Sequence, residues 1–223
     1  MNGGAGAPWP GVPAGPAERD QVVAGHLGRR ALLAGAGGTG FVLALAACDG
    51  HPRRPVYGGD FATMALAAAL ENQLVAFYRA VLTAARARRL GPRVQAFTDL
   101  AQTCLSQHVD HASTWNSILR SAGKPPVSGV PLASHSLVRS SLGAATKVDR
   151  AAALAAAMES QAEQTYVVAA GSLASAAGID AAASIAPVEA MHAAIFRFML
   201  GEDPAPVSFG GSVPAAAVTD LTT

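Results

Sequence analysis

Apolar residues recur at intervals of three and four along four stretches of the chain, which is the spacing of one face of an α-helix. The clearest pattern lies in residues 92–122, where the repeating positions are Val94, Phe97, Ala101, Cys104, His108, His111, Trp115 and Ile118. The same spacing predicts helices over residues 63–89, over residues 149–177, and from a turn at 178–180 to residue 201. The sequence therefore predicts an all-α domain of four long helices within residues 61–201.

Glycine and proline separate the predicted helices. Gly91 and Pro92 fall between the first two, and a Gly-, Pro- and Ser-containing connection, residues 123–147, follows the second. Pro187 suits the first turn of a helix, and Gly201 lies where a helix stops. A connection as long as residues 123–147 is uncommon in a compact domain unless it crosses over other elements. Short, long and short connections thus predict two antiparallel hairpins joined by a long crossover.

Each predicted helix carries a carboxylate or an imidazole on a face that otherwise has the pattern of a buried one. In the last helix, Glu189 and His192 lie three residues apart on the same face as Ile185 and Phe196. A Glu-x-x-His pair that points into a helical core allows one helix to offer two ligands to a metal ion. The last helix is therefore the first candidate for a metal-binding element.

A repeated motif relates the first predicted helix to the third. Glu71 is followed by Gln at the second and Tyr at the seventh position after it, and Glu159 is followed by the same residues at the same offsets. With the helices paired in this way, His111 in the second helix corresponds to His192 in the fourth. The sequence indicates two similar hairpins that face each other.

Residues 61–207 resemble the ferritin-like domain family, in particular the branch found in exported and desiccation-related proteins. The motifs that carry the resemblance are LENQLVAFY around Glu71 and IAPVEAMHAAIFRFMLGEDPAP around Glu189. The resemblance implies a four-helix bundle of ferritin-like topology. It also implies that two helices each supply one Glu to a metal site and that the other two each supply a Glu-x-x-His pair.

Transferred by position, this pattern matches every expected ligand except one. In the second helix His111 is present, but the place of the expected Glu is taken by His108. The predicted metal ligands are Glu71, His108, His111, Glu159, Glu189 and His192. Glu163, one turn from Glu159, is a possible additional ligand.

Three carboxylates and three imidazoles shift the preference of the site away from a di-iron centre, toward zinc, copper, or a mixed or single metal. The resemblance itself implies iron and the oxidation of Fe(II) by dioxygen, so that an enzyme of this kind would be a ferroxidase-like oxidoreductase. The alternative is a network of Glu–His hydrogen bonds without metal. The chain would then be a non-catalytic helical envelope lipoprotein that acts as a stress or interaction scaffold.

Residues 1–47 resemble a twin-arginine export signal that ends in a lipobox. Arg29 and Arg30 precede a weakly apolar run over residues 31–47, which closes on Leu-Ala-Ala-Cys48. We expect cleavage before Cys48, lipidation of Cys48, and export to the outer face of the cytoplasmic membrane. A short transmembrane anchor is the alternative. Residues 48–60 are predicted to be a linker, and residues 202–223 a flexible tail.

The formal net charge of +1 changes this picture little. Lys and Arg number 16 against 15 acidic residues and are not clustered, so the sequence gives no support for nucleic-acid binding. The membrane, through lipidated Cys48, is the partner that the sequence predicts. A protein partner stays open, with a homodimer as one option.

Overall fold

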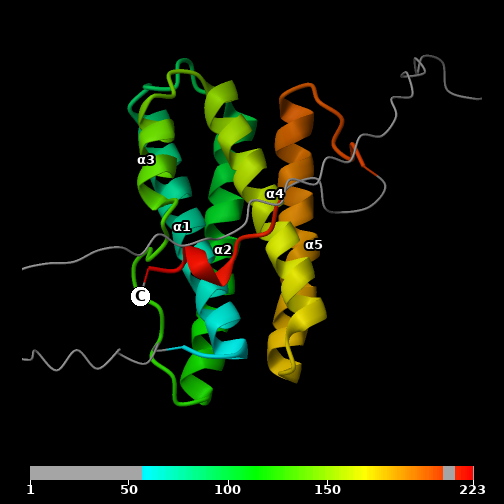
Figure 1. Cartoon of the computed structure of the whole chain (residues 1–223). Helices are drawn as coiled ribbons and strands as arrows, with labels where there is room; N and C mark the ends of the chain where they lie inside the picture. The colour runs from blue at the N-terminus through cyan, green and yellow to red at the C-terminus, as the bar shows by residue number, and fades with distance from the viewer. Residues whose placement is uncertain (1–56, 208–213, 223) are drawn as a thin grey trace, which may run out of the picture. The chain divides into compact units, whose positions relative to one another are not determined.

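A computed structural model of the chain describes residues 57–207 and 214–222. The chain divides into two units, Met1–Asp49 and Gly50–Thr223, and all the described residues belong to the second. Their elements are α1 (Asp60–Arg86), α2 (Gln95–Ser121), α3 (His135–Gly143), α4 (Val148–Ser172), α5 (Ala176–Met199) and a 3-10 helix, η1 (Val218–Asp220) (Figure 1). The described part contains no strand, so the all-α prediction is confirmed.

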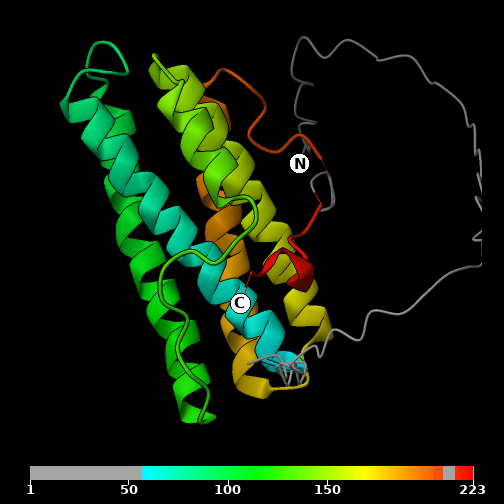
Figure 2. The ribbon, with the colours of Figure 1, turned by 60° about the vertical axis from the view of Figure 1, so that its left-hand side comes forward.

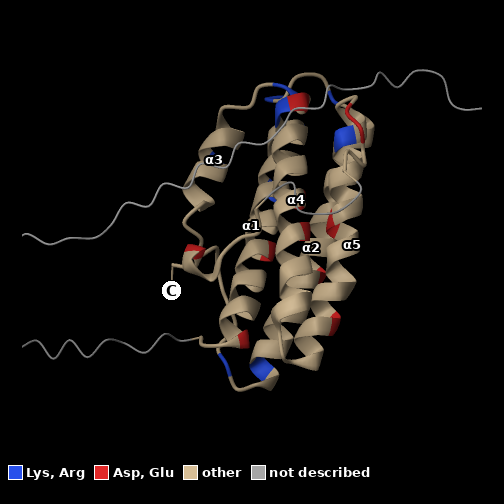
Figure 3. Cartoon of the chain, turned by 45° about the vertical axis from the view of Figure 1, so that its right-hand side comes forward, with Lys and Arg blue, Asp and Glu red and all other residues tan. Residues whose placement is uncertain are grey.

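The four long helices pack as two pairs, α1 along α2 and α4 along α5 (Figure 2). Each pair is joined by a short connection, and α2 also contacts α5 while α1 contacts α4. The interior holds large, fully buried side chains from all four helices: Met64, Tyr78, Phe97, Trp115, Tyr166 and Phe196. Basic side chains lie mostly near the ends of the long helices, whereas acidic ones also occur along their length (Figure 3). The acidic residues at mid-length include the buried carboxylates of the site described below.

The connection between the pairs contains a helix that the sequence did not predict. In α3, Leu142 is buried and Val138 packs against the core, and the helix contacts α1 and α4. Its nine residues make just over two turns, too short to give a clear periodic pattern between Pro- and Gly-containing segments.

The turn between α4 and α5 lies earlier than predicted. α4 ends at Ser172 and α5 begins at Ala176, so the turn predicted at 178–180 is wrong. The Ser175 hydroxyl caps α5 by accepting a hydrogen bond from the Gly178 amide. Gly178 lies within the helix, where its lack of a side chain allows close packing: a Cβ there would lie 2.7 Å from Met64 Cε. Pro187 is inside α5 rather than in its first turn.

The segment that follows α5 returns to the domain. Leu221 forms an antiparallel bridge with Leu132, and the Ala216 amide donates to Thr165 Oγ1 at 2.9 Å. These contacts connect residues 214–222, which fall in the predicted tail, to α4 and to the connection before α3. The predicted signal and lipidation site, residues 1–48, lie outside the described residues, as does the predicted linker up to residue 56.

Within the described residues, α5 alone is long and apolar enough to cross a membrane by length and composition. Buried core helices meet the same criterion, and α5 buries Ile185, Glu189, His192 and Phe196 against its neighbours. This buried face accounts for part of its apolar character, whereas Met191, Ile195 and Phe198 of the same helix are exposed.

Candidate metal centre

The structure brings all six predicted ligands together between the four long helices. Each helix contributes at the same level: Glu71 from α1, His108 and His111 from α2, Glu159 from α4, and Glu189 and His192 from α5. Four of the side chains are fully buried, and the two most exposed, His111 and His192, have side-chain exposures of 13% and 5%. Glu163, the possible additional ligand, does not belong to this cluster. It is partly exposed and lines a surface pocket with Met191 and Arg197.

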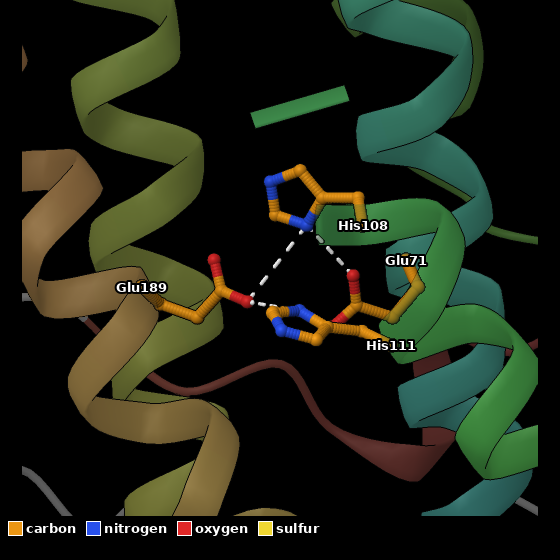
Figure 4. A group of neighbouring side chains, drawn as sticks. All are labelled: Glu71, His108, His111 and Glu189. Atoms are coloured by element: carbon orange, nitrogen blue, oxygen red, sulfur yellow. Dashed lines mark hydrogen bonds and ion pairs between the residues drawn. The ribbon is translucent and has the colours of Figure 1, made fainter. Parts of the chain in front are cut away.

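His108 lies between two carboxylates that come from opposite helix pairs. Its Nδ1 is 2.7 Å from Glu71 Oε2, and its Nε2 is 3.2 Å from Glu159 Oε1. Figure 4 shows His108 and His111 pointing toward Glu71 and Glu189. Since ionised carboxylates only accept hydrogen bonds, both ring nitrogens of His108 donate and the ring is an imidazolium.

Two overlapping groups of four side chains could each hold a metal ion. One consists of Glu71, His108, His111 and Glu189, and the other of His108, Glu159, Glu189 and His192. In the first, His111 Nδ1 lies 2.9 Å from Glu189 Oε1. In the second, His192 Nδ1 lies 3.4 Å from Glu159 Oε2 and 3.5 Å from Glu189 Oε2. His108 and Glu189 belong to both groups.

The charges of the cluster reinforce one another. Burial alone would lower the pKa of His108, but Glu159 and Glu71 raise it well above its usual value. Burial alone would raise the pKa of both carboxyls, but His108 lowers each of them below the usual range. Before any metal binds, these three side chains therefore form a charged, hydrogen-bonded unit.

The two other histidines also hold protons firmly. Burial alone would lower their pKa values, but the nearby carboxylates, Glu189 first, raise that of His111 to about 9, and the nearby Cys104, Glu159 and Glu189 side chains raise that of His192 to about 12. Burial raises the pKa of Glu189 itself. A metal ion that binds these histidines must displace protons from them.

Two tyrosines support the cluster in a reciprocal manner. Tyr78 of α1 donates its hydroxyl hydrogen bond to Glu159 of α4, and Tyr166 of α4 donates to Glu71 of α1. Each tyrosine follows its own glutamate by seven residues, two helical turns, so the repeated sequence motif generates both bonds. Burial and the neighbouring carboxylates raise the pKa of both phenols, which stay protonated as donors.

We expect Tyr78→Phe and Tyr166→Phe each to lower the free energy of unfolding by about 1.5–3 kcal/mol, because each removes a hydrogen bond to a buried, charged carboxylate. Urea unfolding followed by circular dichroism measures this loss. Tyr57→Phe is the control: its hydroxyl donates to the neutral Pro125 carbonyl at 3.0 Å, and about 0.5–1.5 kcal/mol is expected. Equal losses in all three variants would argue against a special role for the two buried bonds.

Sequence reasoning missed one residue at the site. His192 Nε2 donates a hydrogen bond to Gln107 Oε1 at 2.6 Å, which orients the ring and leaves Nδ1 to face the carboxylates. Gln107 is next to His108 and lies off the apolar seam of α2, so the periodic pattern gives it no special place. Gln107 reaches His192 because α2 packs close to α5, and the sequence pattern does not show this distance between helices.

Comparison with known proteins agrees with this architecture. The sequence matches the ferritin-like domain over residues 59–202. The chain belongs to the ferritin-like domain family. A crystal structure of a conserved hypothetical protein, rv2844, from Mycobacterium tuberculosis is similar to this ferritin-like chain, with a TM-score of 0.51 and 20% sequence identity over 67% of this chain and 96% of that one. At that identity the likeness concerns the fold alone. None of the curated proteins compared with the chain matches it.

The ferritin-like core contains an unusual concentration of unpartnered polar atoms. In the described residues, seven buried side-chain nitrogen and oxygen atoms have no hydrogen-bond partner. Five of them belong to the cluster: His111 Nδ1, Glu159 Oε2, Glu189 Oε1, Glu189 Oε2 and His192 Nδ1. Imidazole nitrogens and carboxylate oxygens are ligands of transition metals, so the residues of the cluster fit a bound metal ion.

Proposed function

We propose that the chain is a metal-binding protein that holds a transition-metal ion in its core, between four long helices that form a bundle of ferritin-like topology. The observation that carries this proposal is the convergence of five unpartnered, buried ligand atoms on one place. Each buried polar atom without a partner costs about 1–3 kcal/mol, and more where it is charged. A metal ion bound by these atoms offsets that cost.

The residues that would hold the ion are those of the two overlapping groups, with Glu189 common to both. A mixture of imidazole and carboxylate ligands suits zinc, copper and iron. When bound, an iron ion would supply the electron transfer to dioxygen that the family resemblance implies, whereas zinc would supply a fixed positive charge. The protein keeps its ligands in place through Tyr78, Tyr166 and Gln107, which hydrogen-bond Glu159, Glu71 and His192, respectively. The export signal and lipid anchor of residues 1–48 stay predictions from the sequence.

The test compares metal content in the full chain and in the double variant Glu189→Ala, His192→Ala, after reconstitution with Fe(II), Zn(II) or Cu(II) and removal of excess metal. We expect stoichiometric metal by mass spectrometry in the wild type and loss of it in the double variant. Chelation should lower the melting temperature of the wild type by ~5–10 °C, because a ligand at a hundred times its Kd contributes about 2.7 kcal/mol.

The matched control is the double variant Glu163→Ala, His135→Ala, which removes the same two residue types outside the cluster. Its metal content should equal that of the wild type. Equally negligible metal in the wild type and in both variants would contradict the proposal. The Glu–His network would then be structural, as in the scaffold alternative.

A further inference from the structure

We propose that the core binds a single metal ion, held by Glu159, Glu189 and His192, and that the His108 side chain, with both ring nitrogens engaged by carboxylates, fills the place of a second ion. This inference rests on the proposed function, and it assigns different roles to two halves of a cluster that the sequence repeat makes look equivalent. Glu71 corresponds to Glu159 in the repeat, and His111 corresponds to His192. The atoms that these residues leave free for a metal ion nevertheless differ between the two halves.

His108 has no nitrogen left for a metal ion. Its Nδ1 and Nε2 each lie at hydrogen-bond distance from a carboxylate, 2.7 Å from Glu71 and 3.2 Å from Glu159. Ligation through either nitrogen would therefore break a hydrogen bond to a buried carboxylate. His108 therefore joins α1 and α4 through their glutamates.

The free ligand atoms lie on the α4–α5 side. Glu159 Oε2, Glu189 Oε2 and His192 Nδ1 are all unpartnered, and the nitrogen is 3.4 and 3.5 Å from the two oxygens. Ligand atoms about 2.1 Å from a tetrahedral metal ion lie about 3.4 Å from one another. The nitrogen is thus already spaced from both oxygens as in a site for one ion, and three protein ligands leave a position open for an exogenous ligand.

On the α1–α2 side the corresponding set is incomplete. Glu71 Oε1 accepts the Tyr166 hydrogen bond and Glu71 Oε2 is paired with His108. That leaves only His111 Nδ1 and Glu189 Oε1 without hydrogen-bond partners, 2.9 Å apart. Two free atoms, one of them from the carboxylate shared with the other side, are too few for a second ion.

The surroundings of His192 and His111, which correspond in the repeat, also favour His192 as the metal ligand. His192 Nε2 donates to Gln107, which fixes the ring with Nδ1 toward the two carboxylates. Such a partner for the non-ligating nitrogen is the usual support of a metal-bound histidine. His111 has no comparable hydrogen bond in the described structure, is more exposed, and borders a surface pocket.

The experiment titrates the metal-free full chain with Co(II), whose visible absorption reports ligation, and measures bound cobalt by mass spectrometry. The variants are His192→Ala and its counterpart in the repeat, His111→Ala, together with Gln107→Leu. We expect one Co(II) per wild-type chain, at least 100-fold weaker binding in His192→Ala, and less than a threefold change in His111→Ala. Gln107→Leu should weaken binding 10–100-fold. Far-UV circular dichroism establishes that each variant is folded.

Two Co(II) ions per wild-type chain, or equal losses in the two histidine variants, would overturn the single-ion inference and leave the proposed metal-binding function intact. If the wild type bound no metal, the proposed function would fail and this inference with it. Should His192→Ala not fold, Gln107→Leu still decides: its partly exposed side chain contacts no metal, so undiminished binding there would exclude His192 as the oriented ligand.

Discussion

Replacing His108 by glutamate is expected to raise the bound metal from one ion per chain to two. The substitution removes an imidazolium and adds a carboxylate, so the cluster changes from three carboxylates and three imidazoles to four and two. It also releases Glu71 Oε2, which His108 Nδ1 contacts at 2.7 Å. Glu71, His111 and Glu189 would then offer a second set of ligands, with the new carboxylate as a fourth.

The same substitution should destabilise the metal-free domain. Glu71 and Glu159 lose the buried cation that lowers the pKa of each, and removal of one partner from a buried ion pair costs about 3–5 kcal/mol. Metal should restore most of this loss. We therefore expect a melting temperature that depends on metal much more steeply in His108→Glu than in the wild type.

Metal content by mass spectrometry and thermal unfolding with and without chelator check both expectations. His135→Glu is the matched control, because it makes the same change of residue at a partly exposed position of α3, outside the cluster. One ion per chain in His108→Glu, with unchanged stability, would show that His108 does not exclude a second ion.

The sequence predicted most of the helical framework because the framework depends on local pattern. Residues 92–122 carry an unbroken three–four alternation, and α2 occupies all but their ends. The α4–α5 turn was misplaced because Gly178 resembles a helix breaker, whereas in the structure it allows close contact with Met64. Tertiary packing overrides local preference at such positions.

The six candidate ligands could be chosen from the sequence because helical spacing and the half-repeat place them on inward faces. What the sequence could not show is how unequally they are used. The pairing of both His108 nitrogens, the contact of Gln107 with His192, and the crossed tyrosine bonds all join residues at least 37 positions apart. These contacts depend on the distance between helices, which no pattern within one helix encodes.

The apparent affinity for a divalent metal is expected to rise about tenfold per pH unit between pH 6.5 and 8. The pKa of His192 in the metal-free domain is about 12, since its hydrogen bonds outweigh the effect of burial. Its Nδ1 is therefore protonated throughout this range and must release one proton when it binds the ion. Binding that releases one proton strengthens as pH rises, with unit slope in the logarithm of the affinity.

The steepness of that pH dependence counts the histidines that ligate. His108 is not a ligand of the proposed ion, and in the metal-free domain His111, with a pKa of about 9, is largely protonated below pH 8. If His111 ligated as well as His192, two protons would leave and the affinity would rise about a hundredfold per pH unit. Zn(II) titrations against a competing chelator, at several pH values, distinguish the two slopes, and His111→Ala should preserve a slope of one. A slope of two that falls to one in His111→Ala would place His111 among the ligands, and the asymmetry between the halves of the core would then be lost when metal binds.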